Sequence, residues 1–346
     1  GWINFDDVLG QMQAFGLDIE AGDIVVGQRE KRGWFQLYEI SKSDGSGLLI
    51  VGSFGAFFGA ENMVQKVELK KDDKQSMTAE QMAALKARIA EDKKRAEAET
   101  KRRNERAAKE AEVAWRKCLP AGESAYLVRK CVEGFGVRYS PSGAMAIPML
   151  DVSGRIHGLQ IIRAVKSNGR DKDFWPVGLA KKGHFYQFGG IPDGVLLIVE
   201  GYATGASVHM ATGLPVAVAF DAGNLMPVAQ ALHKRYSRTK IVICADDDYR
   251  TDGNPGVKHA ESAALAVGGT VVVPVFEDER PADRKGPTDF NDLHVLEGLQ
   301  SVKSQLEAHL AGNAIAISKA PARGEQGEQG GGEKRERRAA MSVTGR

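Results

Sequence analysis

The sequence is poor in cysteine and has no long apolar run. Its three cysteines, Cys118, Cys131 and Cys244, are scattered and form no C-x-x-C pair. This argues against a disulfide framework and against a zinc ribbon, and it is typical of a protein of the reducing cytoplasm. No apolar stretch approaches the roughly 20 residues that a membrane-spanning helix needs. We therefore predict a cytoplasmic protein with no membrane partner.

Other common signatures are also missing. No phosphate-binding loop of the G-x-x-x-x-G-K-S/T type occurs, so the chain carries no helicase of its own. His157, His184 and His209 lack metal-ligand spacing, and we interpret them as structural. There is no visible signal peptide, and the chain begins with Gly1 rather than Met, which indicates a processed chain or a fragment. The formal net charge of +2 hides strong local segregation and decides nothing about nucleic acid.

Four short apolar runs, rich in β-branched residues, lie in the second half of the chain. They are 195–199, 215–220, 241–245 and 270–275. This pattern is typical of strands that are buried on both faces of a parallel sheet. Helix-like stretches separate the runs, at 204–210, 225–236 and 257–267. The alternation of strands and helices predicts an α/β fold.

Acidic residues follow these runs at their carboxyl ends. Glu200 follows the first run, Asp221 the second, and Asp246-Asp247-Asp248 the third. Ligands of open parallel sheets bind beyond the carboxyl ends of the strands, so these acids are expected to converge. If the backbone is still extended, Asp246 and Asp248 point the same way and Asp247 the other. Clustered carboxylates suit Mg²⁺ or Mn²⁺, whereas the alternative interpretation is that they are solvated loop residues.

A family resemblance rests on these residues and their surroundings. Glu200-Gly201 after one strand and Asp246-x-Asp248 after a later one resemble a Toprim domain. The segments 219–225, 244–248, 253–256 and 288–292 resemble the Toprim domain of plasmid- and phage-encoded DNA primases of the TraC type, over roughly Pro120 to Leu299. The resemblance implies that Asp246 and Asp248 hold Mg²⁺ or Mn²⁺. It also implies that Glu200 is a ligand or proton acceptor and that Asp289 adds a contact.

The resemblance further implies an activity. It predicts a DNA-dependent primase that joins ribonucleoside triphosphates into short RNA primers on single-stranded DNA, in plasmid or phage replication, with a replicative helicase as a possible partner. A Toprim nuclease would use the same acids with water as the nucleophile. A topoisomerase would need a nucleophilic Tyr on a further DNA-binding domain. A non-catalytic nucleic-acid-binding module is the remaining alternative, although nothing structural requires three acids at this place.

The chain divides by composition into six segments. We expect a small, mostly β module at 1–72, a long charged helix at 76–118 and a basic, β-rich primase lobe at 119–192. A Rossmann-like Toprim sheet at 193–300, a terminal helix at 301–317 and a disordered tail at 318–346 follow. The helix is predicted to start at Thr78, since Thr78-x-x-Gln81 is a capping box, and to be a solvated spacer.

Basic residues are the candidates for contact with nucleic acid or nucleotide phosphates. In the lobe these are Lys130, Arg163, Lys172, Lys181 and Lys182. In the Toprim segment, Lys258 stands in the first turn of a helix whose N-terminus can hold a phosphate, and Asn291 lies in the segment that the family places at the edge of the site. Taken singly, each cation is better explained as surface charge.

The N-terminal module offers a second candidate surface for nucleic acid. Arg29, Lys31 and Arg32 stand beside Trp34, Phe35 and Tyr38. Cations interleaved with aromatic rings suit single-stranded nucleic acid, through phosphate pairing and base stacking. The alternative is that the rings belong to the core of the module and that the cations occupy a solvated turn.

Overall fold

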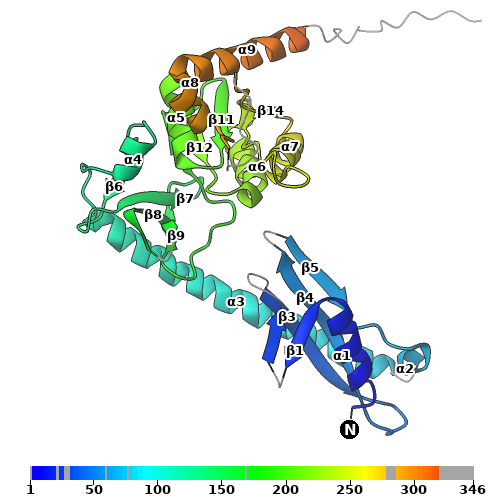
Figure 1. Cartoon of the computed structure of the whole chain (residues 1–346). Coiled ribbons are helices and arrows are strands. Elements are labelled where there is room, and N and C mark those ends of the chain that lie inside the picture. Colours follow the sequence, from blue (N-terminus) through cyan, green and yellow to red (C-terminus); the bar gives the residue numbers. More distant parts are fainter. Residues whose placement is uncertain are drawn as a thin grey trace, which may run out of the picture.

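The computed structural model describes residues 2–20, 23–26, 32–58, 61–75, 78–167, 170–277 and 286–318. Arg29, Lys31 and residues 319–346 of the tail predicted at 318–346 lie outside the described residues, whereas Ser318 is described as the end of a helix. The helix α3 (Ala79–Lys117) runs from an N-terminal module to the remainder of the chain (Figure 1). No helix among the described residues is both long and apolar enough to cross a bilayer.

The N-terminal module is mostly β, as predicted. It contains α1 (Phe5–Ala14), β1 (Leu17–Glu20), β2 (Asp23–Val26), β3 (Arg32–Ser41), β4 (Leu48–Phe58), β5 (Glu61–Lys66) and α2 (Lys71–Gln75). The strands β3, β4 and β5 form an antiparallel sheet, and β1 pairs with β2. Val8 and Met12 of α1 are buried against Leu17, Ile50 and Phe54, and these residues form the core of the module. Phe35 is 52% exposed, whereas Tyr38 is buried.

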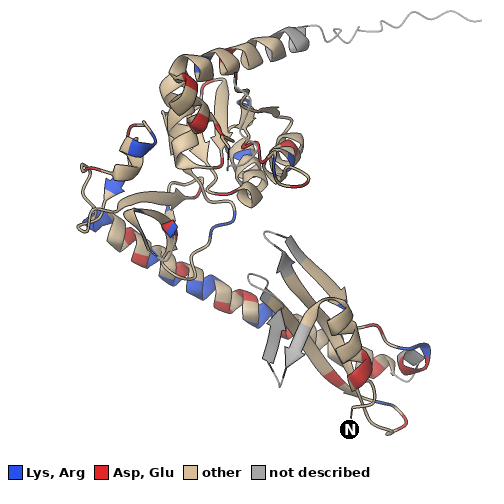
Figure 2. Cartoon of the chain, viewed as in Figure 1, with Lys and Arg blue, Asp and Glu red and all other residues tan. Residues whose placement is uncertain are grey.

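The long helix α3 starts as the capping box predicted. Thr78 is its N-cap: Gln81 N donates to Thr78 Oγ1 over 3.1 Å, and Thr78 N donates to Gln81 Oε1 over 2.9 Å. Lys, Arg, Asp and Glu alternate along its surface (Figure 2). Its only buried residues, Ala107, Ala108 and Ala111, lie near its C-terminal end, where it packs against β8. That end is therefore docked on the lobe. The other end contacts the N-terminal module, where Leu85 packs against Tyr38, Ile40 and Val51, so only the turns between the two ends are a solvated spacer.

The lobe after α3 is an antiparallel sheet with one short helix. It comprises α4 (Ala125–Arg129), β6 (Arg138–Tyr139), β7 (Met145–Leu150), β8 (Ile156–Ser167) and β9 (Arg170–Trp175), with the strands in the order β6-β7-β8-β9. Arg155 links the sheet to α3 because its guanidinium lies 2.7 Å from Glu105 Oε1. Arg138 stacks over Trp115 of the same helix at 4.7 Å.

The third part is a five-stranded sheet with the order β10-β12-β11-β13-β14. Its elements are β10 (Tyr186–Phe188), β11 (Val195–Val199), α5 (Tyr202–Thr212), β12 (Val216–Val218), η1 (Ala222–Asn224), α6 (Leu225–Arg235), β13 (Lys240–Cys244), α7 (Pro255–Val267), β14 (Thr270–Val272), α8 (Phe290–Glu297) and α9 (Leu299–Ser318). The pairs β11–β12, β11–β13 and β13–β14 are parallel, which confirms the predicted α/β sheet. The strand β10, assigned from sequence to the preceding lobe, is an antiparallel edge of this sheet.

The two faces of this sheet are covered by different helices. Leu197 and Val199 of β11 face the cluster that contains α5, α8 and α9, whereas Leu196 and Ile198 face α6 and α7. This alternation explains why the strands are apolar at every position. The first cluster also contains Met145 and Ile147 of the lobe, so the lobe and the sheet share one core.

Candidate active site

Acidic side chains gather at the carboxyl edge of the sheet, as the sequence predicts. Glu200 directly follows β11, Asp221 follows β12 by two intervening residues, and Asp246 follows β13 by one. Burial, and then the nearby Asp248 and Asp221 carboxylates, raise the pKa of Glu200 to about 7. Burial and the charge of Glu200 also raise the pKa of Asp246 well above its usual value. These side chains therefore share one electrostatic environment.

The donors suit a hard divalent cation. Asp246 Oδ1 is buried and has no hydrogen-bond partner among the described residues, so one carboxylate oxygen is left for a ligand. All of the clustered donors are oxygens, which Mg²⁺ and Mn²⁺ prefer. In the part of the chain that the structure describes, however, no three His, Cys, Asp or Glu side chains stand close enough together to hold a metal ion. The chemistry of the donors fits, whereas their side chains do not form a closed metal site in this structure.

The three consecutive acids after β13 have different surroundings. Asp247 is 8% exposed; its Oδ1 accepts from Asn254 Nδ2 at 2.6 Å, and its N donates to Thr288 O at 2.7 Å. Asp248 Oδ2 instead accepts from Gly256 N at 3.1 Å. Asp247 therefore holds two loops in place. By contrast, the charge of Asp248 raises the pKa of Glu200, and the charge of Glu200 raises the pKa of Asp246. This division agrees with the alternation expected of extended backbone.

The N-terminus of α7 is already occupied. Gly256 N donates to Asp248, and Val257 N lies 3.4 Å from Asn254 Oδ1, the side chain of the N-cap residue. The prediction that this helix end holds a phosphate is therefore not supported, since two of its N–H groups have partners within the chain. Lys258 is exposed in the first turn, and the structure does not connect its side chain to the carboxylates.

Asp289 and Asn291 have structural functions at the start of α8. Asp289 is the N-cap, and its Oδ1 accepts from Asn291 N at 2.7 Å and from Asp292 N at 2.8 Å. Burial and the neighbouring Asp292 carboxylate raise its pKa. Asn291 is fully buried, and its Nδ2 donates to Lys130 O and Ser207 Oγ. This corrects the interpretation of Asn291 as a nucleotide contact, because no part of it faces solvent.

Two of the predicted lysines lie beside the acidic edge. Lys181 pairs with Asp221 Oδ2, and its ammonium lies 4.9 Å from the centroid of the Phe174 ring. Lys130 Nζ lies 3.5 Å from Asp292 Oδ1. The structure therefore brings Lys130 and Lys181 to the carboxylates from the lobe.

The other predicted cations lie elsewhere on the lobe. Arg163 pairs with Asp173 across the β8–β9 hairpin. Lys172 lies over the Tyr126 ring at 5.2 Å. Lys182 is exposed. None of the three is joined to a carboxylate of the sheet edge by a contact that the described structure contains.

Sequence reasoning missed two residues of this site. Asp292 receives both Lys130 and the Thr288 N–H, the latter over 3.0 Å. Asn224 ties the lobe to the end of β12 through its buried amide. Their positions within Asp-Phe-Asn-Asp and Asp-Ala-Gly-Asn were the available signal, but spacing alone does not identify their partners.

Comparison with known proteins agrees with this geometry. Residues 195–300 match the Toprim domain family. Two Escherichia coli proteins named DNA primase TraC are similar in sequence. One is 38% identical over 152 residues, which are 42% of this chain and 10% of that protein. The other is 35% identical over 215 residues, which are 59% of this chain and 19% of that protein. The chain thus spans less than a fifth of the length of either relative.

Solved structures with some similarity are also primases. The primase fragment of the bacteriophage T7 primase-helicase protein is 19% identical at a TM-score of 0.37, over 52% of this chain and 70% of that chain. The DnaG primase catalytic domain bound to ssDNA is 14% identical at a TM-score of 0.42, over 64% of this chain and 84% of that chain. Scores this low say nothing about the site. From the family match and the sequence relatives, residues 195–300 are a Toprim domain, and the chain resembles the Toprim DNA primases of the TraC type.

Proposed function

We propose that the chain is the catalytic part of a DNA-dependent primase. It would join ribonucleoside triphosphates into short RNA primers on single-stranded DNA, by nucleotidyl transfer that depends on Mg²⁺ or Mn²⁺. One observation carries the proposal: Glu200, Asp246 and Asp248 share an electrostatic environment at the carboxyl edge of a Toprim sheet. The similarity to TraC primases supports the choice of reaction. A plasmid or phage setting and a helicase partner belong to the same proposal.

The chemistry follows from the donors. A divalent ion held by Asp246, Asp248 and Glu200 would offset negative charge on the phosphate and on the leaving pyrophosphate. Glu200, with a pKa of about 7, is suited to accept the proton of an attacking hydroxyl at its carboxylate when it is not a ligand. Asp247 and Asp289 would maintain the backbone on which these groups sit, through their bonds to Asn254 and to the first turn of α8.

The lobe would supply positive charge for the nucleotide. Lys130 and Lys181 reach the carboxylate edge from the lobe, and each is already held by an acid, Asp292 or Asp221. Their ammonium groups are therefore placed before a substrate arrives, which reduces the cost of ordering them during binding.

Primer synthesis is the direct test. The protein is incubated with single-stranded DNA, labelled ribonucleotides and Mg²⁺ or Mn²⁺, beside an Asp246→Ala/Asp248→Ala variant. We expect short labelled products that disappear in the variant. Shortened template without primers would instead indicate the Toprim nuclease alternative. DNA binding with neither product would contradict a self-sufficient primase and favour a binding module.

A further inference from the structure

The segment 180–184 carries Lys181 to the carboxylate edge without support from regular secondary structure. It lies between the lobe and β10, and no helix or strand covers these residues. Lys181 nevertheless has a defined position, between Asp221 and the ring of Phe174. An irregular segment keeps one conformation only if side chains from elsewhere fix its backbone.

Asn224 fixes this backbone from the side of the sheet. The residue is 3% exposed. Its Oδ1 accepts from Gly183 N at 2.7 Å, and its Nδ2 donates to His184 O at 3.0 Å and to Ala219 O at 2.8 Å. The backbone N–H of Asn224 also donates to Asp221 Oδ1 at 3.0 Å. One residue thus holds both the segment that carries Lys181 and the acid that receives it.

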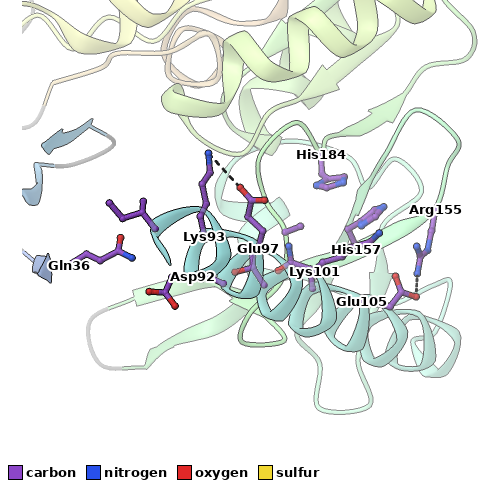
Figure 3. A pocket seen from close by; sticks show the side chains of 14 residues that line it. Gln36, Asp92, Lys93, Glu97, Lys101, Glu105, Arg155, His157 and His184 are labelled. Carbon is purple, nitrogen blue, oxygen red and sulfur yellow. Dashed lines mark hydrogen bonds and ion pairs between the residues drawn. The ribbon is translucent and has the colours of Figure 1, made fainter. Parts of the chain in front are cut away.

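The lobe fixes the same segment from the other side. The ring of His184 stacks on the ring of His157, with 3.9 Å between centroids and 24° between planes. His157 is held in turn, because its Nε2 lies 2.8 Å from Asp151 Oδ2. Both rings line a groove of about 750 Å³ between α3 and the lobe, together with Arg155 and Glu105 (Figure 3). The segment is therefore held on one side by Asn224 at the sheet edge and on the other by the His157 ring of the lobe, on which its own His184 stacks.

We propose that Asn224 is a positioning residue that acts through Lys181. Its amide anchors the segment 180–184, and this anchoring places the Lys181 ammonium on Asp221 beside the carboxylates, where it meets the phosphates of the incoming nucleotide. The role of Lys181 rests on the proposed function; the clamp itself does not. The side chain of Asn224 bonds the backbone of Gly183, His184 and Ala219, so we expect its loss to weaken nucleotide binding only while Lys181 is present.

Limited proteolysis tests the clamp independently of activity. Lys182 is exposed and offers a tryptic bond within the clamped segment. We expect Asn224→Ala to raise the rate of cleavage after Lys182 by about tenfold, because local opening becomes easier. Asn4→Ala is the matched control. Asn4 is 5% exposed, and like Asn224 it uses both ends of its amide: its Nδ2 donates to Ile50 O and its Oδ1 accepts from Ile50 N. It should lower thermal stability without changing cleavage at Lys182, and an equal rise in both variants would overturn the clamp.

A double-mutant cycle tests the action through Lys181. The apparent KM for ribonucleotides is measured in primer synthesis for Asn224→Ala, Lys181→Ala and the double variant. We expect Asn224→Ala to raise KM severalfold in the wild-type background and hardly at all beside Lys181→Ala. Effects that simply multiply would overturn the positioning role, since a purely structural loss is indifferent to Lys181.

The two failures are distinguishable. If the wild-type protein makes no primers, the proposed function fails, while the cleavage rates still decide whether Asn224 clamps the segment. If Asn224→Ala does not fold, Asn224→Ser leaves a smaller cavity and takes its place in both measurements. Unchanged cleavage in a folded variant would refute the clamp.

Discussion

Glu200 is buried among other acids, and this has a measurable consequence for stability. Its pKa is raised from 4.5 to about 7, so the folded protein holds a proton that the unfolded chain releases. Stability from this group is therefore complete below about pH 4.5 and is lost as pH rises through about 7. Glu200→Gln keeps the neutral form at every pH.

We expect metal-free Glu200→Gln to melt higher than the wild type at pH 8, and we expect the gap to close toward pH 5. A difference of 1 kcal/mol in the free energy of unfolding corresponds to a shift in Tm of roughly 2–4 °C for a folding unit formed by the lobe and the sheet together. Thermal melts in chelator at both pH values measure it. A gap of the same size at pH 5 and pH 8 would mean that Glu200 is not protonated in the folded protein.

Gly256 lies so close to the acids after β13 that a larger residue is expected to displace them. A Cβ atom added there would press against the backbone oxygen of Asp246 and lie 3.0 Å from Asp248 Oδ2. We expect Gly256→Ala to cost about 1–3 kcal/mol of stability and to abolish most metal-dependent activity, because both acids shift. Gly10→Ala in α1 is the control, since nothing lies within 4 Å of its Cβ position. Chemical denaturation and primer synthesis check both variants, and an active, stable Gly256→Ala would contradict the close approach.

At the scale of elements, substitutions of Asp289 can distinguish its function as the N-cap of α8 from a function of its negative charge. Asn and Asp are equally good N-caps, whereas Ala costs about 1 kcal/mol. We therefore expect Asp289→Asn to keep the stability that α8 has in the wild type and Asp289→Ala to lose it. If the carboxylate also serves the cation, both variants lose activity alike; if it only caps, Asp289→Asn stays active. Thermal melts and primer yields of the two variants decide between these functions.

The sequence predicted those elements whose signals are local. The strands 195–199 and 241–245 are apolar throughout, and their acids follow at the ends, so the sheet and the positions of Glu200 and Asp246 were predictable. The capping box at Thr78 was equally local. Partners that are not neighbours in sequence were not predictable: spacing could not show that Asn224 Oδ1 accepts from Gly183 N or that Asp248 Oδ2 accepts from Gly256 N in α7. The pairing of β10 with β12 was unpredictable for the same reason, since it joins two segments that are distant in sequence.

At the scale of the whole molecule, the cores define the cooperative units. Tyr202 of α5 joins the lobe to the Toprim sheet: Phe135 N donates to its Oη at 2.7 Å, and its ring lies in the core shared with Met145 and Ile147. The N-terminal module has a core of its own around Phe54. Because no buried cluster of the described residues spans both parts, they are expected to unfold separately.

We expect calorimetry to resolve two transitions, of which only one responds to a divalent cation. If Mg²⁺ or Mn²⁺ binds the folded Toprim edge and not the unfolded chain, as the proposed function requires, a concentration of 100 times Kd adds about 2.7 kcal/mol to the stability of that unit alone. The Asp246→Ala/Asp248→Ala variant should show both transitions and no response to the cation. A single transition would mean that α3 couples the module to the rest more strongly than its three buried alanines indicate. A cation response of the N-terminal transition would place the metal elsewhere in the chain.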